Sequence, residues 1–224
     1  MLGPVLLIAD LHTPQRWYNM LRIFRRTSPM SIGSYVLTAF GAFSMASLVP
    51  GLKRVTQVPA AIAGAGMASY TPALLASTAT PLWSAAPRAL GAEFASAAFA
   101  SGAAALLLSS QEKSLEAACC AATLAYGAAS YVATREHEKK GVDRALKRGK
   151  WAAMHKAGLG FGVALPLACF ALNAIAGRSA RRSALGAAGI LAGVFLSRWA
   201  LFEAGNESAR DPSDYLRLAS RQWN

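Results

Sequence analysis

The strongest constraint on this chain is the alternation of long apolar stretches with short clusters of charge. Residues 87–110 and 151–176, for example, run for more than twenty positions with few charged side chains. The hydrocarbon core of a bilayer is about 30 Å thick and takes roughly 20 residues of helix at 1.5 Å per residue. A soluble protein carries about 25% charged residues, whereas this chain carries 15%. The pattern therefore predicts an all-α integral membrane bundle.

About six transmembrane helices fit into the sequence, and we expect them to form one domain over residues 1–224. The predicted spans are 30–52, 56–80, 87–110, 114–134, 151–176 and 182–204. A charged loop, 135–150, separates the fourth span from the fifth, and a polar tail covers 205–224. Residues 1–29 precede the bundle. They begin with MLGPVLLIA, which is too short to cross a bilayer and lacks the cationic segment of a signal peptide. We interpret this start as the last turns of a helix.

The distribution of Lys and Arg predicts the orientation. With six spans, both ends of the chain and the second and fourth loops share one side. That side holds fifteen basic residues, the opposite side holds six, and two fall inside spans. The positive-inside rule places the richer side in the cytoplasm. Because the charges lie in short loops, topology and docking of a partner explain the net charge of +12 better than nucleic-acid binding.

Ionisable residues inside membrane spans are costly, and they mark functional sites. Glu93 lies about 9 Å and His155 about 6 Å into its span at 1.5 Å per residue. Arg198 and Glu203 lie near the exit of the last span, and Tyr70 lies near mid-bilayer. The alternating topology puts four of these residues in the leaflet of the basic side, namely Glu93, His155, Arg198 and Glu203. This predicts a polar pocket that opens on that side.

A simpler interpretation competes for single residues. Long basic side chains near helix ends can extend to the interface, and salt bridges can serve only to orient helices, without any further function. For Lys156 and Arg198 taken alone we favour that interpretation. For the whole set, which Asp10 and Arg16 approach from the same side, a polar pocket is the better explanation.

Several chemistries fit the sequence poorly. The three cysteines lack metal-ligand spacing, so iron–sulfur or zinc binding by this chain is not expected. Haem in a membrane bundle typically needs His on facing helices. Only His155 lies in a predicted span, whereas His12 and His137 fall in loops, so a di-haem protein is nearly excluded and a single haem would need an unusual second ligand. Phosphate-binding loops and soluble-type catalytic motifs are missing. A quinone ring, or a transported polar solute, could use the Tyr, His and carboxylate groups instead.

The most specific motif lies at 10–34, with DLHTPQR (10–16), NMLR (19–22) and TSPMSIGS (27–34). It resembles the NrfD/PsrC family, the membrane subunits of polysulfide reductase, nitrite reductase and related complex iron–sulfur molybdoenzymes. Tyr35 stands where the family often has Trp. Further segments are similar to family motifs: YTPALL (70–75), with Pro72 for the usual Gly, TPLW (80–83), and RW, AG, SA and DP between 198 and 212.

The resemblance implies a non-haem subunit without its own iron–sulfur cluster, in the inner membrane of a prokaryote. It would exchange electrons between menaquinone or ubiquinone and a four-cluster ferredoxin-like subunit, which serves a molybdopterin-type catalytic subunit. Tyr70 matches the family's quinone-side tyrosine. The predicted role of Glu93, His155 and Glu203 in quinone binding or a proton route rests on their depth in the spans alone. We expect subunit contacts or structural ion pairs at Asp10, Arg16, Asn19, Arg22, Ser28 and Arg198.

The resemblance also bears on the start of the chain. Family members have about eight helices, and the motif at residue 10 follows the second of them. We therefore expect that the first helix and most of the second are lacking here, through a misassigned start or a fragment.

Two alternatives remain. A transporter would explain why Pro72 and Pro166 interrupt the second and fifth spans at matching depths. A structural anchor without a quinone site is the other.

Overall fold

The computed structural model describes residues 9, 14–147 and 149–213, and in these ranges it contains helices and no strands. Five helical segments are long and apolar enough to cross a membrane: α3 (Lys53–Ala76), α5 (Pro87–Ser110), α6 (Lys113–Lys140), the continuous α8–α9 segment (Lys150–Ile175) and α10 (Ala180–Arg210). The predicted all-α membrane bundle is therefore confirmed. The chain divides into two compact units, Met1–Leu74 and Leu75–Asn224, which we describe one at a time as the N-terminal and the C-terminal unit.

The N-terminal unit contains the 3-10 helix η1 (Pro14–Leu21), α2 (Pro29–Ala46) and most of α3. Ser28 caps α2, because its Oγ accepts a hydrogen bond from the backbone N–H of Ser31 at 3.4 Å. The Tyr35 hydroxyl donates to the Leu21 carbonyl at 2.7 Å and ties α2 to η1. The capped start and this side-chain bond fix how the chain enters α2.

The predicted first span, 30–52, is too long. The observed helix, α2, ends at Ala46, and residues 47–52 form turns that contain Pro50 and the positive-φ Gly51 (φ 91). Proline interrupts helical hydrogen bonding, and a glycine in the left-handed conformation reverses the chain. The helix therefore ends before the apolar stretch does. With 18 residues, α2 is not among the five segments that satisfy the length and composition of a span.

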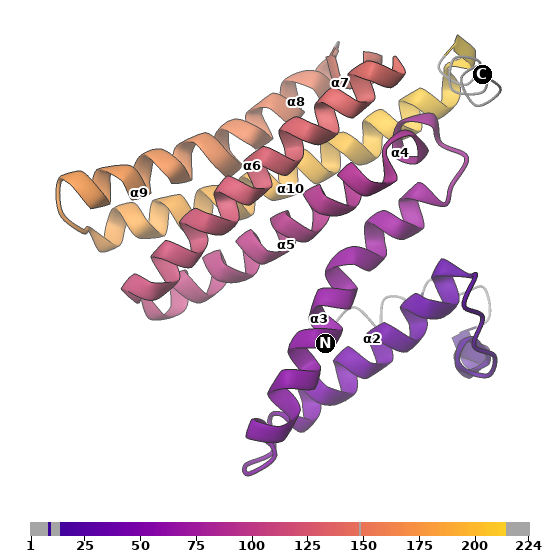
Figure 1. Ribbon diagram of the computed structural model, residues 1–224, viewed down its shortest axis with the longest axis horizontal. Helices are drawn as coiled ribbons and strands as arrows, with labels where there is room; N and C mark the ends of the chain where they lie inside the picture. Colours follow the sequence, from indigo (N-terminus) through magenta and orange to yellow (C-terminus); the bar gives the residue numbers. More distant parts are fainter. Residues whose placement is uncertain (1–8, 10–13, 148, 214–224) are drawn as a thin grey trace. The chain divides into compact units, whose positions relative to one another are not determined.

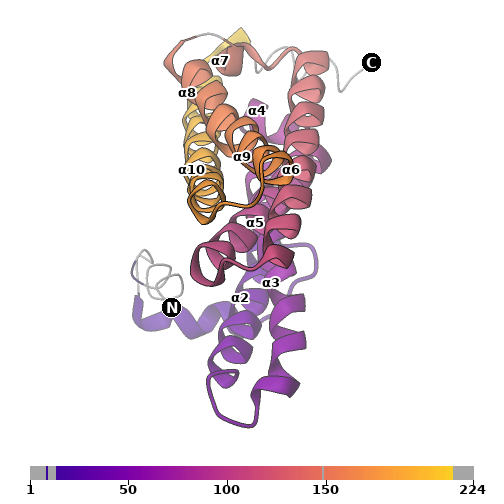
Figure 2. The same ribbon diagram turned by 90° about the vertical axis from the view of Figure 1, so that its left-hand side faces the viewer.

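The C-terminal unit is a bundle of α5, α6, α8–α9 and α10, which run side by side in Figures 1 and 2. Short helices α4 (Pro81–Ala85) and α7 (Arg144–Lys147) lie at one end, and a π-helical turn, η2 (Gly160–Ala164), joins α8 (Lys150–Leu159) to α9 (Leu165–Ile175). The central core is built largely from alanine and small aliphatic residues of α5, α6 and α10, packed around the fully buried Tyr126. Small residues let helices approach closely in lipid, where burial adds little driving force.

The closest approach lies between the α8–η2 segment and α10. Gly158 and Gly162 face Gly193, and a methyl group at Gly193 would overlap the backbone of Gly162. Only glycine allows two helix backbones to meet in this way. These three positions therefore set the packing of the C-terminal unit.

Two predicted boundaries in this unit are wrong, and the fifth span, although its ends are as predicted, is irregular inside. The loop expected at 135–150 is helical in large part, since α6 continues to Lys140 and α7 follows. Within the extension, His137 is buried, and its Nε2 lies 2.9 Å from the Leu82 carbonyl. The polar tail expected from 205 is helical to Arg210, because Ser208 packs under α4 and accepts a bond from the Leu82 N–H. The fifth span contains η2 in place of a regular helix.

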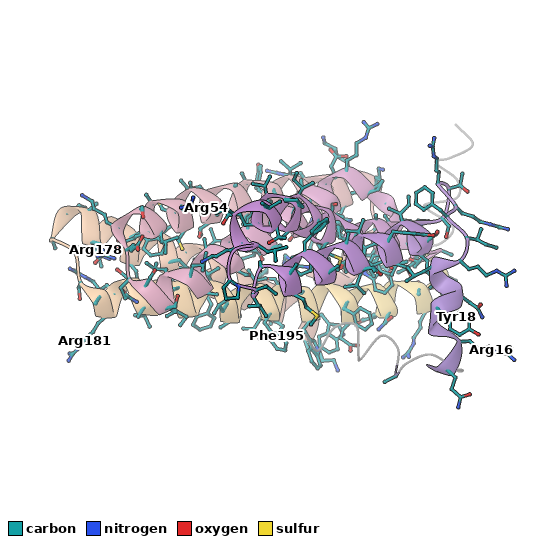
Figure 3. All side chains as sticks on the ribbon, turned by 90° about the horizontal axis from the view of Figure 1, so that it is seen from below. Arg16, Tyr18, Arg54, Arg178, Arg181 and Phe195 are labelled. Atoms are coloured by element: carbon teal, nitrogen blue, oxygen red, sulfur yellow. The ribbon has the colours of Figure 1, made fainter. Side chains whose placement is uncertain are left out.

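Charged groups gather at the two ends of the C-terminal bundle. At the end formed by α7, Arg144 pairs with Asp211 at 3.3 Å and Lys147 with Asp143 at 2.7 Å. The carboxylates of Asp143 and Glu138 raise the pKa of Lys147. At the other end lie Arg178, in the α9–α10 connection, and Arg181, in the first turn of α10 (Figure 3). Arg178 pairs with Glu116 at 2.8 Å. The apolar length of the bundle lies between these charged ends, as a membrane-spanning unit requires.

Candidate functional site

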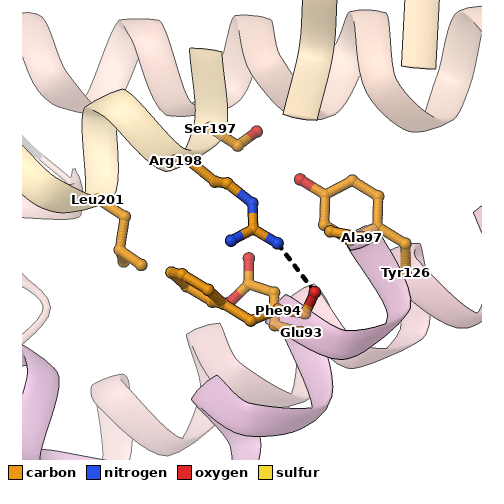
Figure 4. Close-up of a pocket in the computed structure, with 7 residues that line it drawn as sticks. All are labelled: Glu93, Phe94, Ala97, Tyr126, Ser197, Arg198 and Leu201. Carbon is orange, nitrogen blue, oxygen red and sulfur yellow. Dashed lines mark hydrogen bonds between the residues drawn. The ribbon is translucent and has the colours of Figure 1, made fainter. Parts of the chain in front are cut away.

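A cluster of polar side chains lies inside the C-terminal bundle, between α5, α6 and α10 (Figure 4). Glu93 of α5 is 7% exposed. Its Oε1 accepts a hydrogen bond from the Ser130 hydroxyl of α6 at 3.0 Å. A carboxylate buried this deeply is tolerated only with partners, and Ser130 is one of them.

Arg198 of α10 supplies the opposite charge. Its Nη2 donates to the Phe94 carbonyl at 2.8 Å, and its Cζ lies 4.0 Å from the centre of the Phe94 ring. The guanidinium also attracts the Glu93 carboxylate electrostatically. Phe94 directly follows Glu93 in α5. Arg198 therefore interacts with one turn of α5, through a hydrogen bond and a cation–π contact with Phe94 and through its charge with Glu93. The Arg198 side chain therefore turns into the bundle and does not extend to the interface; a role limited to orienting α10 against α5 remains compatible with these contacts.

These groups surround a cavity of ≈ 10 Å³ that Glu93, Tyr126, Ser197 and Arg198 line on its polar side. Its size suits about one water molecule. Ser197 is 3% exposed, and its hydroxyl lies near that of Tyr126 without a hydrogen bond of ordinary length to any described residue. The cluster can therefore hold a water and a proton beside the carboxylate. A quinone ring is far too large for it.

The structure brings together two of the four residues predicted to form a pocket in the basic-side leaflet. Glu93 and Arg198 line the cavity, whereas His155 and Glu203 do not. Glu203 follows Arg198 by five positions, which turns it about 140° around the helix. His155 is buried on α8, within electrostatic range of His137. Position in the sequence predicts the depth of a residue along its helix, but not the direction in which its side chain points around the helix axis.

The other predicted site residues belong to the N-terminal unit. The Tyr70 ring covers Gly33, so that a methyl group at position 33 would overlap it, and the side chain stays half-buried. Arg16, Asn19 and Arg22 are exposed. Figure 3 shows the Arg16 side chain projecting from η1. Their predicted roles in subunit contact stay predictions.

Asp10 and Ser28 are the remaining predicted positions. Asp10 lies outside the described residues. Ser28 has a structural role as the cap of α2.

Sequence reasoning missed Tyr126, Ser130 and Ser197. Tyr126 lies thirteen residues into α6, deep in an alanine-rich span. Its depth in the span is the same signal that singled out Tyr70, and this signal was sufficient to predict Tyr126 as well. Ser130 and Ser197 gave no signal, because serine is frequent at helix contacts in membranes.

The described residues contain no group of three or more His, Cys, Asp or Glu side chains that could hold a metal ion. His137, which the sequence placed in a loop, lies on a helix, but its ring bonds the Leu82 carbonyl. The expectation that this chain carries neither haem nor an iron–sulfur cluster stays a prediction.

The five spans and the buried charge cluster define a multi-pass membrane protein with polar chemistry inside its bundle. The family model described as polysulfide reductase, of the NrfD type, matches residues 1–210. The chain belongs to this family, whose members are membrane subunits of redox complexes. No curated protein and no solved structure matches the chain significantly.

Proposed function

We propose that the protein is the quinone- or quinol-interacting membrane subunit of an iron–sulfur oxidoreductase complex. It passes electrons between the quinone pool, menaquinone or ubiquinone, and a four-cluster iron–sulfur subunit linked to a molybdopterin-type catalytic subunit. Its place is the inner membrane of a prokaryote. The observation that carries the proposal is the family match over residues 1–210.

The chemistry of the spans supports the proposal. When a quinone takes up two electrons, each carbonyl oxygen also takes up a proton, so a quinone site needs hydrogen-bond donors and a proton route. The Tyr70 hydroxyl is a donor inside α3, six residues before its end at Ala76, and the Glu93 carboxyl can hold a proton beside Ser130. Side chains of this kind inside membrane spans are expensive, which is the reason to assign them a function.

Exchange of Tyr70 for phenylalanine tests the first of these groups. Tyr70→Phe keeps the ring over Gly33 and removes only the hydroxyl. We expect quinone reduction or oxidation by the purified complex to slow several-fold, because the variant loses roughly the free energy of one neutral hydrogen bond. Tyr18→Phe is the matched control, because Tyr18 is exposed on η1. Equal quinone kinetics in both variants would remove Tyr70 from the site.

Exchange of Glu93 for glutamine tests the proton route. Glu93→Gln keeps the shape and a partner for Ser130 but cannot ionise. We expect turnover with quinone to fall roughly tenfold or more, since proton transfer by a positioned group contributes about 10²–10⁴-fold. Glu112→Gln, exposed at the opposite end of the bundle, is the control. Full activity in Glu93→Gln with intact assembly would leave Glu93 a structural residue.

Two other functions predict different experimental outcomes. A structural anchor predicts normal assembly of the complex without quinone binding. A transporter predicts solute flux in liposomes that contain this chain alone. The best support for a transporter is that Pro72 lies inside α3 and that Pro166 is the second residue of α9, which follows the π-helical turn η2.

A further inference from the structure

The segment that leads into α2 presents apolar and basic side chains next to one another on its surface. Ile23 is 56% and Phe24 53% exposed, and two further exposed residues, Arg25 and Arg26, follow them directly. Residues 11–92 contain no Asp or Glu. The described part of the N-terminal unit therefore offers these two arginines no carboxylate, and a lasting counter-charge has to come from another molecule.

The helix before this segment lies across the helix after it. Figures 2 and 3 show η1 running across the direction of α2. Because α2 contains no charged residue over its 18 positions, we expect it to follow the apolar depth of the bilayer and to begin at the surface. A helix that lies across its end is then parallel to the membrane plane, as interfacial amphipathic helices are.

Hydrogen bonds hold the segment on the first turn of α2. The Arg25 N–H donates to the Ser31 Oγ at 3.1 Å, and the Ser31 hydroxyl donates to the Ile23 carbonyl at 3.2 Å. The Ser28 N–H donates to the Arg25 carbonyl at 3.2 Å. These bonds keep Arg25 and Arg26 close to the start of α2, which is the depth of the lipid head groups.

The Phe24 ring lies on the side toward which α2 extends. It meets the Tyr35 ring edge-on, with 5.1 Å between the ring centres. Tyr35 is six residues into α2, about 9 Å along the helix at 1.5 Å per residue. An exposed aromatic ring at this level, beside basic groups at the surface, is typical of a membrane interface.

Two of the residues predicted to contact a subunit lie on another face. Residues three apart share a face of a 3-10 helix. Asn19 and Arg22 are spaced in this way, and the Arg22 N–H donates to the Asn19 carbonyl at 3.3 Å. Tyr18 and Leu21 share the neighbouring face of η1. The N-terminal unit can therefore meet lipid with one face and a subunit with another.

We propose that residues 23–26 bind an anionic phospholipid at the bilayer surface. Arg25 and Arg26 pair with its phosphate, and Ile23 and Phe24 lie among the first methylene groups of its acyl chains. A guanidinium matches phosphate geometry with two parallel hydrogen bonds. Basic residues next to a span are also attracted by the negative potential of the cytoplasmic leaflet, the side on which the charge distribution places this segment. The site depends on the membrane location of the chain and is independent of the proposed quinone role.

Removal of both charges tests the proposal. The purified complex is titrated with a photoreactive phosphatidylglycerol, and labelling is measured on the peptide that covers residues 17–32. In Arg25→Gln/Arg26→Gln we expect the lipid concentration for half-maximal labelling to rise roughly 20-fold, since each arginine at an anionic surface contributes about fivefold. Because charge remains in Arg25→Lys/Arg26→Lys, that variant should stay within a few-fold of the wild type.

The matched control removes two positive charges from the same predicted side of the membrane. In Arg135→Gln/Lys139→Gln the lost cations are exposed, but they already pair with Glu138 at 3.2 Å and Glu136 at 2.9 Å. This variant should keep wild-type labelling of residues 17–32. An equal loss of labelling in the control would show a general effect of net charge and would contradict a site at 23–26.

Competition on the wild-type complex keeps the test valid if the glutamine variant fails to fold. Unlabelled phosphatidylglycerol should suppress the labelling, and unlabelled phosphatidylcholine should do so far less. Equal suppression by the two lipids would overturn the proposal, because it would show no selection for a negative head group. Loss of a partner subunit from Arg25→Gln/Arg26→Gln, with unchanged lipid labelling, would assign the two arginines to subunit docking and overturn it as well.

Discussion

Arg198 illustrates how a single residue can be misjudged from its depth in a span. Near a helix end, an arginine is expected to extend toward the interface. Here its guanidinium turns inward, because Phe94 offers both a carbonyl at 2.8 Å and a ring face at 4.0 Å, with the Glu93 carboxylate beside them. The direction of the Arg198 side chain depends on groups of α5, so no pattern within the α10 sequence predicts it.

Gly205 gives a prediction at the same scale. It lies on α10 against the Trp83 indole, whose Nε1 donates to the Leu201 carbonyl at 3.2 Å. In Gly205→Ala the new methyl group overlaps the indole, so Trp83 must move and its bond is strained or lost. We expect destabilisation by about 1–3 kcal/mol, the usual cost of overpacking, seen as a lower unfolding midpoint in detergent.

The control for this prediction is Gly91→Ala on α5, where no heavy atom lies within 4 Å of the added Cβ. There alanine should be neutral or stabilising by up to about 1 kcal/mol, because it favours the helix. Equal midpoints in the two variants would show that Trp83 does not pack against Gly205.

At the scale of elements, the sequence predicts helices well where their ends carry local signals. The third span is observed as predicted at both ends, since Pro87 occupies the first turn and Gln111 ends the helix in a left-handed conformation (φ 52). Prediction fails where distant contacts extend a helix through polar residues. His137 bonds the Leu82 carbonyl and Ser208 accepts from the Leu82 N–H, so α6 and α10 continue because α4 packs on both. The η2 turn has no comparable signal, as glycine-rich helices are common in membranes.

The end of α10 gives a prediction that depends on pH. Hydrogen bonds from the Ser213 hydroxyl and N–H, together with the charge of Arg144, hold the pKa of Asp211 below its ordinary value. A lowered pKa means that the stabilisation is present above the ordinary aspartate pKa of about 3.9 and is lost as pH falls through the folded value. We expect Asp211→Asn to lower the unfolding midpoint slightly at neutral pH and to equal the wild type in acid. The wild-type advantage should also shrink in high salt, because the pair with Arg144 is exposed. A difference that persists unchanged in acid would contradict this account.

At the scale of the whole molecule, the number of crossings decides which loops share a side. Five segments qualify as spans, and α2, with 18 residues, is about 27 Å long, slightly short of a 30 Å core. Arg25 and Arg26 precede α2, and Lys53 and Arg54 follow it. Charges on both flanks mark helix ends that reach the interfaces, and a short span can be accommodated by local thinning of the bilayer. We therefore expect α2 to cross, as the sequence predicts.

Single cysteines at positions 26, 53, 79 and 112 test this, in a variant whose Cys119, Cys120 and Cys169 are replaced by alanine. With α2 as a span, 26 and 79 lie on the basic, cytoplasmic side, and 53 and 112 lie on the opposite side. A membrane-impermeant maleimide should then label 53 and 112 in intact cells, and 26 and 79 only after permeabilisation. If α2 does not cross, 26 and 53 react together, and the number of crossings falls to five. Because 79 and 112 flank α5, their labelling on opposite sides calibrates the assay, and position 26 alone decides the role of α2.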